Sequence, residues 1–312
     1  MRPAEKNSML KNLNLKASGG WFIAITGALL FSTKAIFVKL AFQHTHVSAL
    51  HLLVLRMLFS MPFYVFAGLY SHQKATRKIT KKQWILIAIM GLLGYYLSSL
   101  FDFIGLQYVS AGLERLILFL YPTFTVLINT FILKTRLKRI QLIALILTYL
   151  GIGIAFLGEV QIDTSNAYFY YGSFMVFLCA ITYSIYLSGS GKLVPIIGPT
   201  PYTAYVMLFA TGGVFLHFLL TAHTTTHAFF EPSLVLYGIA LAIVATVLPS
   251  FLLNIGMKKV GSNNIAIITS IGPVSTILQA HFFLNEPILM LQILGTLLVI
   301  IGVLLTGLKN SM

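Results

Sequence analysis

The chain has 312 residues, of which 58% are hydrophobic and only 9% are charged, and its mean hydropathy is +0.89. Soluble domains carry about 25% charged residues, so this composition excludes a soluble globular protein. The net charge of +14 does not indicate a nucleic-acid-binding protein, because the basic residues stand in short connections between apolar runs. Backbone groups in lipid must be bonded internally, which predicts an all-α integral membrane protein.

Ten apolar segments are long enough to cross a bilayer as helices, which takes about 20 residues each. In chain order they are 20–42, 47–70, 82–106, 111–133, 139–158, 168–189, 200–221, 233–256, 263–284 and 287–308. Residues 1–19 are polar and basic, and we expect a disordered cytoplasmic tail there. A signal peptide is disfavoured, because the apolar run that follows is long and lacks a small-residue cleavage site. Residues 309–312 form the second cytoplasmic tail.

The distribution of Lys and Arg tests this count, because cytoplasmic loops are enriched in both residues. With a cytoplasmic N-terminus, 17 of the 21 basic residues fall in predicted inside segments. No predicted outside loop contains Lys or Arg, and the other four basic residues lie within or at the ends of spans. The sequence therefore predicts a multi-pass protein of the cell inner (plasma) membrane with both termini cytoplasmic.

The two halves of the chain match when one is shifted by 151 residues. The matched pairs are Gly105 with Gly256, Val109 with Val260, Pro122 with Pro273, Thr125 with Thr276, Gln141 with Gln292 and Gly151 with Gly302. Each repeat, 20–158 and 159–308, contains five predicted spans, and because five is odd the second repeat should be inverted. Inverted repeats are typical of secondary transporters, which work by alternating access.

Four segments of the chain resemble the drug/metabolite transporter superfamily, and more closely its EamA-type ten-helix transporters. They are "GALLFSTKAIFVKLAF", the arginine in "LLVLRMLFSMP", "YYLSSLFDFIGLQYVSAGLERLILFLYPT" and "GSNNIAIITSIGPVSTILQAHFFLNEP". The resemblance covers about residues 20–308. It implies export of amino acids or related small polar metabolites, coupled to protons or another ion. The repeats are unequal at "LNEP", where Glu286 stands opposite "LKTR" of the first repeat.

Six ionisable side chains fall in the outer half of the first four spans, where a charge at mid-bilayer costs about 2.5–3.5 kcal/mol. They are Lys34, Lys39, Arg56, Asp102, Glu114 and Arg115. Lys39 and Arg115 stand near span ends, from which a long side chain can reach the interface. The deeper four can form two ion pairs, such as Lys34 with Asp102 and Arg56 with Glu114. These pairs either lock helices together or serve transport.

In the transport interpretation, Lys34 and Arg56 hold a substrate carboxylate. Asp102 or Glu114, with Arg115 nearby, takes up a proton or forms an ion pair. Burial and basic neighbours act on protonation in opposite directions, so the sequence leaves the state of these acids open.

The other predicted substrate-binding residues are polar or aromatic: Tyr95, Ser99, Tyr121, Tyr183, Tyr186, Asn254 and Gln279. Packing and interhelical hydrogen bonds explain the same residues equally well. Pro122 and Pro273 stand at matched positions within spans, and each removes a helical hydrogen bond. They are therefore candidate hinges, with static kinks as the alternative.

Metal and catalytic motifs are weak in this sequence. His223 and His227 have a spacing that could ligate a metal. They stand in a Thr-rich outer loop, which favours the interpretation as polar surface. Cys179 lies in an apolar run and reads as a small buried hydrophobic residue. We expect no metal, no cofactor and no enzymatic activity.

The expected partners are a small-molecule substrate and the lipid bilayer, and no nucleic acid is expected. We expect the protein to be a monomer or a homodimer. Three alternatives to metabolite export stay open. They are exchange of a larger charged metabolite such as S-adenosylmethionine or a nucleotide-linked compound, lipid flipping, and passive conduction.

Overall fold

The computed structural model describes residues 3–73, 79–133, 139–162, 167–221, 231–260, 269 and 271–307. Within these ranges the chain forms helices joined by short connections and contains no strand, which confirms the all-α fold class. Some helical side chains lie outside the described part, including those of residues 3–18, Asn129 and Asn254. His223 and His227 lie outside it as well.

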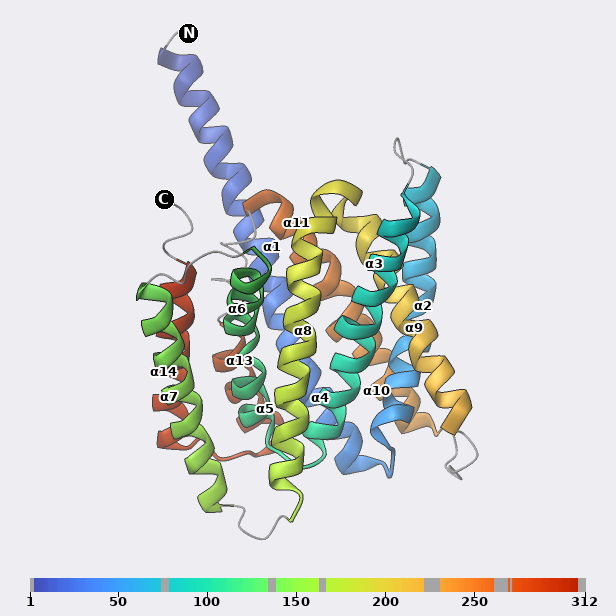
Figure 1. Ribbon diagram of the computed structural model, residues 1–312, viewed down its shortest axis with the longest axis vertical. Coiled ribbons are helices and arrows are strands. Elements are labelled where there is room, and N and C mark those ends of the chain that lie inside the picture. Colours follow the sequence, from blue (N-terminus) through green and yellow to red (C-terminus); the bar gives the residue numbers. More distant parts are fainter. Residues whose placement is uncertain are drawn as a thin grey trace.

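The described residues of the first half form eight helical elements, drawn from blue to light green in Figure 1. They are α1 (Pro3–His44), α2 (Ala49–Gln73), α3 (Lys81–Gly91), η1 (Leu92–Leu97), α4 (Ser98–Leu106), α5 (Ala111–Leu118), α6 (Tyr121–Leu133) and α7 (Arg139–Ile162). Helix α1 begins at Pro3, so it runs through most of segment 1–19 and projects from the bundle.

The second half repeats this order among the described residues. Its elements are α8 (Phe169–Ile197), α9 (Pro199–Thr221), α10 (Pro232–Ala242), η3 (Ile243–Val247), α11 (Leu248–Val260), α13 (Gly272–Leu284) and α14 (Met290–Gly307). Helix α8 ends at Ile197, and the next residue, Gly198, has a positive φ of 94°, which suits a residue without a side chain.

Six helices in the described ranges are long and apolar enough to cross a bilayer. They are Gly19–His44, Ala49–Gln73, Lys81–Leu106, Phe169–Ile197, Pro199–Thr221 and Pro232–Leu253. Shorter apolar stretches lie in α7, at Ile146–Gly158, and in α14, at Met290–Gly302. These lengths identify a multi-pass membrane protein, and the count of ten spans stays a prediction.

The predicted fourth span is divided in the structure. Helix α5 ends at Leu118, and Phe119 has a ψ of 6°, outside the helical range. Helix α6 then begins at Tyr121, so Pro122 is its second residue, where the missing N–H costs no helical hydrogen bond. Pro273 likewise is the second residue of α13. Both prolines therefore begin helices rather than bend continuous ones.

Contacts between helices of the two halves recur when each helix is replaced by its equivalent 151 residues away in the chain. Helix α1 packs on α11 and α13, while α8 packs on the equivalent α4 and α6. In the same way α2 contacts α10, and α9 contacts α3. Helices α2 and α9 contact each other, as do α7 and α14, which lie side by side along one edge of the bundle in Figure 1. The two halves therefore pack against each other through equivalent sets of helices.

The π-helical segments η1 and η3 strengthen this equivalence. They begin at Leu92 and Ile243, which are 151 residues apart. Each contains a wide turn, because Ser98 N–H donates to the carbonyl of Leu93 and Leu248 N–H to that of Ile243. Such turns are rare in proteins and are frequently found at functional sites.

Helices α7 and α14 approach each other closely through glycine. A Cβ added at Gly151 would lie 2.5 Å from the carbonyl oxygen of Gly295. Gly295 in turn lies against the backbone of Gly151. Small residues at such contacts let backbones of membrane helices pack together.

Candidate functional site

A cavity of about 50 Å³ lies where helices of the two halves meet. Its walls come from α1, α2, η1, α4, α5, α6, α8 and α11 together with Thr269. At about 10–15 Å³ for each water, it has room for a few water molecules, whereas ligand pockets usually measure about 300–1,000 Å³. The cavity must therefore widen to hold a metabolite.

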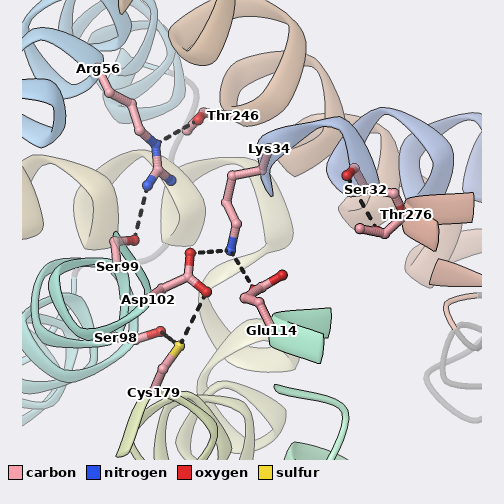
Figure 2. Close-up of polar contacts among 10 residues, drawn as sticks. All are labelled: Ser32, Lys34, Arg56, Ser98, Ser99, Asp102, Glu114, Cys179, Thr246 and Thr276. Carbon is pink, nitrogen blue, oxygen red and sulfur yellow. Dashed lines mark hydrogen bonds and ion pairs between the residues drawn. The ribbon is translucent and has the colours of Figure 1, made fainter. Parts of the chain in front are cut away.

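Lys34 of α1 joins two carboxylates at this site. Its Nζ lies 2.7 Å from Oδ2 of Asp102 on α4 and 3.9 Å from Oε1 of Glu114 on α5. Figure 2 shows the ammonium group between the two acids. Both acids are 0% exposed, and among the described residues neither oxygen of Glu114 has a hydrogen-bond partner. Two buried carboxylates thus share one cation, which leaves room for a proton to balance the charge.

Arg56 of α2 bonds to hydroxyl groups rather than to an acid. Its Nε donates to Oγ1 of Thr246 at 2.8 Å, and its Nη1 donates to Oγ of Ser99 at 3.0 Å (Figure 2). The expected ion pair of Lys34 with Asp102 is present. The prediction that Arg56 pairs with Glu114 is wrong, because Glu114 pairs with Lys34 instead. Glu114 faces Lys34, and the guanidinium of Arg56 is directed at η3 and α4.

Arg115 of α5 faces the cavity. It is 6% exposed and lines the cavity wall, with its guanidinium carbon 5.3 Å from the ring centre of Phe31. Its Nε has no hydrogen-bond partner among the described residues. The alternative in which Arg115 reaches the membrane interface is therefore wrong. Lys39 is also partly buried, and its Nζ donates to the carbonyl of Val109 at 2.8 Å.

Tyrosine rings form one side of the cavity. Tyr95, Tyr121 and Tyr183 line it directly. The rings of Tyr121 and Tyr183 meet edge to face with centres 5.1 Å apart. Tyr186 packs behind them, with its hydroxyl 3.4 Å from that of Tyr95. The second half thus supplies aromatic surface through α8.

The other predicted site residues lie in different places. Ser99 lines the cavity and binds Arg56. Gln279 is not among the residues that line the cavity. Its Nε2 donates to Ser275 within α13 at 2.8 Å. The side chain of Asn254 lies outside the described part. The structure therefore brings together residues of the first four predicted spans more completely than those of the second half.

Sequence reasoning missed several residues of the site. Thr246 binds Arg56 and is the equivalent of Tyr95 under the 151-residue shift, so the repeat could have indicated it. Cys179 is buried as expected, but it also lines the cavity, and its Sγ lies 3.3 Å from Oγ of Ser98. No spacing rule marks a cysteine for that position.

Glu286 of the α13–α14 connection caps helix α5. Its carboxylate accepts hydrogen bonds from the N–H groups of Ala111, at 3.0 and 3.1 Å, and Gly112, at 3.4 Å. An acid is favourable there because the N-terminus of a helix carries partial positive charge. The second half thus holds the short helix that carries Glu114 and Arg115.

A metal centre finds no support in the described ranges. Among them no three His, Cys, Asp or Glu side chains are grouped to hold a metal ion.

A multi-pass helical bundle with a charged cavity between two equivalent halves defines the class of membrane transporters. Comparison with known proteins gives the family: the EamA-like transporter family model matches residues 18–157 and again 170–308. The chain therefore belongs to the EamA-like transporter family and contains its repeat twice.

Several relatives are similar along their whole length. The chain is 30% identical to "Uncharacterized transporter YcbK" of Bacillus subtilis (strain 168), covering 94% of this chain and 92% of the relative. It is 22% identical to "Uncharacterized inner membrane transporter YicL" of Salmonella typhimurium, covering 93% and 96%. A solved crystal structure shares the fold with a TM-score of 0.65 at 20% identity, covering 93% of this chain and 96% of that one.

Proposed function

We propose that this protein is a secondary transporter of the cell inner membrane that exports a small polar metabolite bearing a carboxylate, such as an amino acid. The observation that carries the proposal is the cavity between the two halves, where Lys34, Arg56 and Arg115 are buried together. Cations held inside a membrane bundle are expensive and typically mark a substrate or ion pathway.

The transport mechanism we propose is alternating access between ten spans in two inverted repeats, with both termini cytoplasmic. It is supported by helix contacts that the 151-residue shift exchanges, such as α1 with α11 and α4 with α8. If each repeat adopts the other's conformation, the cavity opens to the opposite face of the bilayer. The breaks before Pro122 and Pro273 are the positions at which α6 and α13 would move against neighbouring helices.

Proton coupling is the second part of the proposal. Asp102 and Glu114 compete for the single ammonium of Lys34, at 2.7 and 3.9 Å. A proton on Glu114 removes this competition, and its loss restores it. Because Lys34 also lines the cavity, the position of its ammonium links protonation to substrate binding.

The alternatives are less well supported. S-adenosylmethionine carries a sulfonium and an ammonium group, which three cations in the cavity would repel. A nucleotide-linked anion fits the charge, but the cavity of about 50 Å³ must widen much further for it than for a small metabolite. Lipid flipping requires a lateral opening toward the bilayer, which nothing in the described cavity suggests.

Transport in sealed vesicles tests the proposal. Metabolite profiles of cells with and without the protein would nominate candidates, and the purified protein in proteoliposomes would then be assayed for their uptake. We expect saturable uptake, counterflow and acceleration by a pH gradient. Uptake without saturation or counterflow would indicate a pore instead, and protein-free vesicles serve as the control.

Cysteine labelling tests the topology. In a Cys179→Ser background, His46→Cys is expected to be labelled from outside and Lys82→Cys from inside. Both positions are exposed, so access to both from one side would overturn the orientation.

A further inference from the structure

We propose that the substrate is an organic anion, with a net negative charge and an apolar body, whose carboxylate binds Arg56 and Arg115. This inference rests on the proposed transport function and narrows its substrate class. An acidic amino acid satisfies it, whereas a zwitterionic or cationic amino acid does not.

The cavity presents cations, while the acids lie behind them. Lys34, Arg56 and Arg115 line the wall, but the two acids do not, and both are 0% exposed. The acids approach Lys34 from the protein side and neutralise it. A ligand in the cavity therefore meets positive charge that no acidic side chain at the wall offsets.

The two arginines have no acidic partner. Among the described residues, the ion pairs formed at this site both involve Lys34, so no carboxylate lies within 4.0 Å of Arg56 or Arg115. With three cations and two acids, the cluster has a net charge of +1 when both acids are ionised. A bound anion supplies the missing negative charge, whereas the ammonium of a zwitterion adds a further cation.

Arg115 has an unmet donor inside the protein. It is 6% exposed, and its Nε makes no hydrogen bond to any described residue. A buried donor without a partner is costly. The Nε and Nη2 atoms lie against Gly272 of α13, where an added Cβ would be 3.1 and 2.6 Å away, so a ligand that completes the bonding draws the guanidinium from Gly272 toward the cavity. The guanidinium carbon lies 5.3 Å from the ring centre of Phe31, and a guanidinium beside an aromatic ring can still bind a carboxylate through its planar fork of donors.

Arg56 is fixed in orientation by the two halves together. Its Nε is bonded to Thr246 of η3 and its Nη1 to Ser99 of α4. These two bonds hold the plane of the guanidinium, and Arg56 also lines the cavity wall, so its remaining N–H groups can meet a ligand there. Preorganised arginine forks suit the paired oxygen atoms of a carboxylate.

Most of the remaining wall is apolar or aromatic and suits the body of the anion, although Ser98, Ser99 and Thr269 add hydroxyl groups. Phe31, Leu118 and Leu253 line the cavity together with the rings of Tyr121 and Tyr183. A carboxylate attached to an aromatic or aliphatic body therefore fits better than a highly hydroxylated anion.

Ligand binding to the purified protein in detergent tests this inference separately from transport. The probes are phenylacetate and succinate as anions, phenylalanine as a zwitterion and lysine as a cation, with affinity measured from thermal stabilisation. We expect at least one anion to bind about tenfold or more tightly than phenylalanine or lysine, the scale of one charge-assisted hydrogen bond. Binding of phenylalanine or lysine equal to or tighter than both anions, or of no probe, would overturn the inference.

Variants then locate the bound carboxylate. Arg115→Gln and Arg56→Gln should each weaken anion binding by about tenfold or more, and Arg115→Lys should keep part of it because the charge remains. Lys39→Gln is the matched control, since Lys39 bonds to Val109 outside the cavity, and it should bind as the wild type does. Anion binding unchanged in both glutamine variants, or equally weakened in Lys39→Gln, would contradict the assignment.

The same probes in proteoliposomes distinguish the two proposals. Anions that bind but show no counterflow would overturn the transport function and leave the anion site standing. Counterflow of phenylalanine or lysine that neither anion inhibits would do the opposite.

Discussion

The two halves of this protein share their architecture but differ in their chemistry. Both contain a π-helical segment at the same position, and both begin a helix with proline as the second residue. Yet the Lys and Arg side chains that line the cavity, and the Asp and Glu side chains paired with Lys34, come from the first half among the described residues. Under the 151-residue shift, Lys34 corresponds to Ile185, Arg56 to Met207 and Asp102 to Leu253. Symmetry in the scaffold is therefore compatible with one-sided binding.

This difference assigns a task to each half. The first half supplies the charged side chains and two tyrosines of the wall, Tyr95 and Tyr121, and the second supplies Tyr183 and the hydroxyl of Thr246. Alternating access requires two halves that exchange conformations, but a substrate with one charged end needs charge on one side only. Some variants remove charged side chains of the site and keep the helix packing. Others disturb the helix packing and keep the charged side chains.

The largest effect is expected from Lys34→Gln, which leaves two buried carboxylates without a cation. Removing one partner of a buried ion pair costs about 3–5 kcal/mol, so we expect a lower unfolding temperature and no measurable uptake. The measurements are thermal unfolding in detergent and uptake in proteoliposomes. Wild-type uptake by this variant would contradict the role of Lys34.

A double variant separates fold from chemistry. Lys34→Ile with Asp102→Leu copies the equivalent residues Ile185 and Leu253 of the second half. Apolar replacement of a buried pair is often neutral for stability, and Glu114, left without Lys34, is expected to be protonated, so this protein should fold but not transport. If it is less stable than Lys34→Gln, the ion pair holds the fold together.

Glu114→Gln should remove proton coupling while leaving the fold intact, because the amide cannot exchange a proton but can still face Lys34. We expect counterflow to persist and its acceleration by a pH gradient to disappear. Uptake is compared with and without the gradient, with Asp102→Asn as the second acidic variant. Full gradient-driven uptake in both variants would end the proton hypothesis.

Gly151→Ala should weaken the contact of α7 with α14 without touching the cavity. Its Cβ would lie 2.5 Å from the Gly295 carbonyl, and such overpacking costs about 1–3 kcal/mol. Gly153→Ala is the matched control, because nothing lies within 4 Å of its added Cβ. Thermal unfolding should separate the two variants, and equal stabilities would show that the helices adjust.

The smallest effect is expected from Glu286→Gln, which keeps the shape of the α5 cap but removes its charge. An acid at a helix N-terminus contributes about 0.3–1 kcal/mol. The cap should therefore release more easily and raise labelling of a cysteine introduced at Ser110 from outside the vesicle. An unchanged labelling rate would mean that the cap does not restrain α5.

Much of the fold could be predicted, because apolar length and the segregation of Lys and Arg report directly on the bilayer. The 151-residue repeat anticipated the matched prolines, whose helical positions the structure then specified. It could not reveal that the fourth span divides at Phe119, since a non-helical ψ at one residue leaves no periodic trace.

The sequence predicts which charged residues lie at the site, but not which side chains they bond to. Cost in lipid marks Lys34, Arg56, Asp102 and Glu114 from sequence alone. Whether Arg56 meets an acid or the hydroxyl of Thr246 depends on how distant helices are rotated, and one residue's rotation on a helix amounts to about 100°. Asp102 paired as expected, and Arg56 did not.

The π-helical turn at Leu92–Leu97 sets the angular phase of everything after it in the third predicted span. If the same residues wound as an ordinary α-helix, the following stretch would be turned by about 100° relative to α3. Ser99 would then point away from Arg56, although the span would stay hydrophobic. The same widening stands at Ile243–Val247 in the second half, where it sets the facing of α11 in the same way.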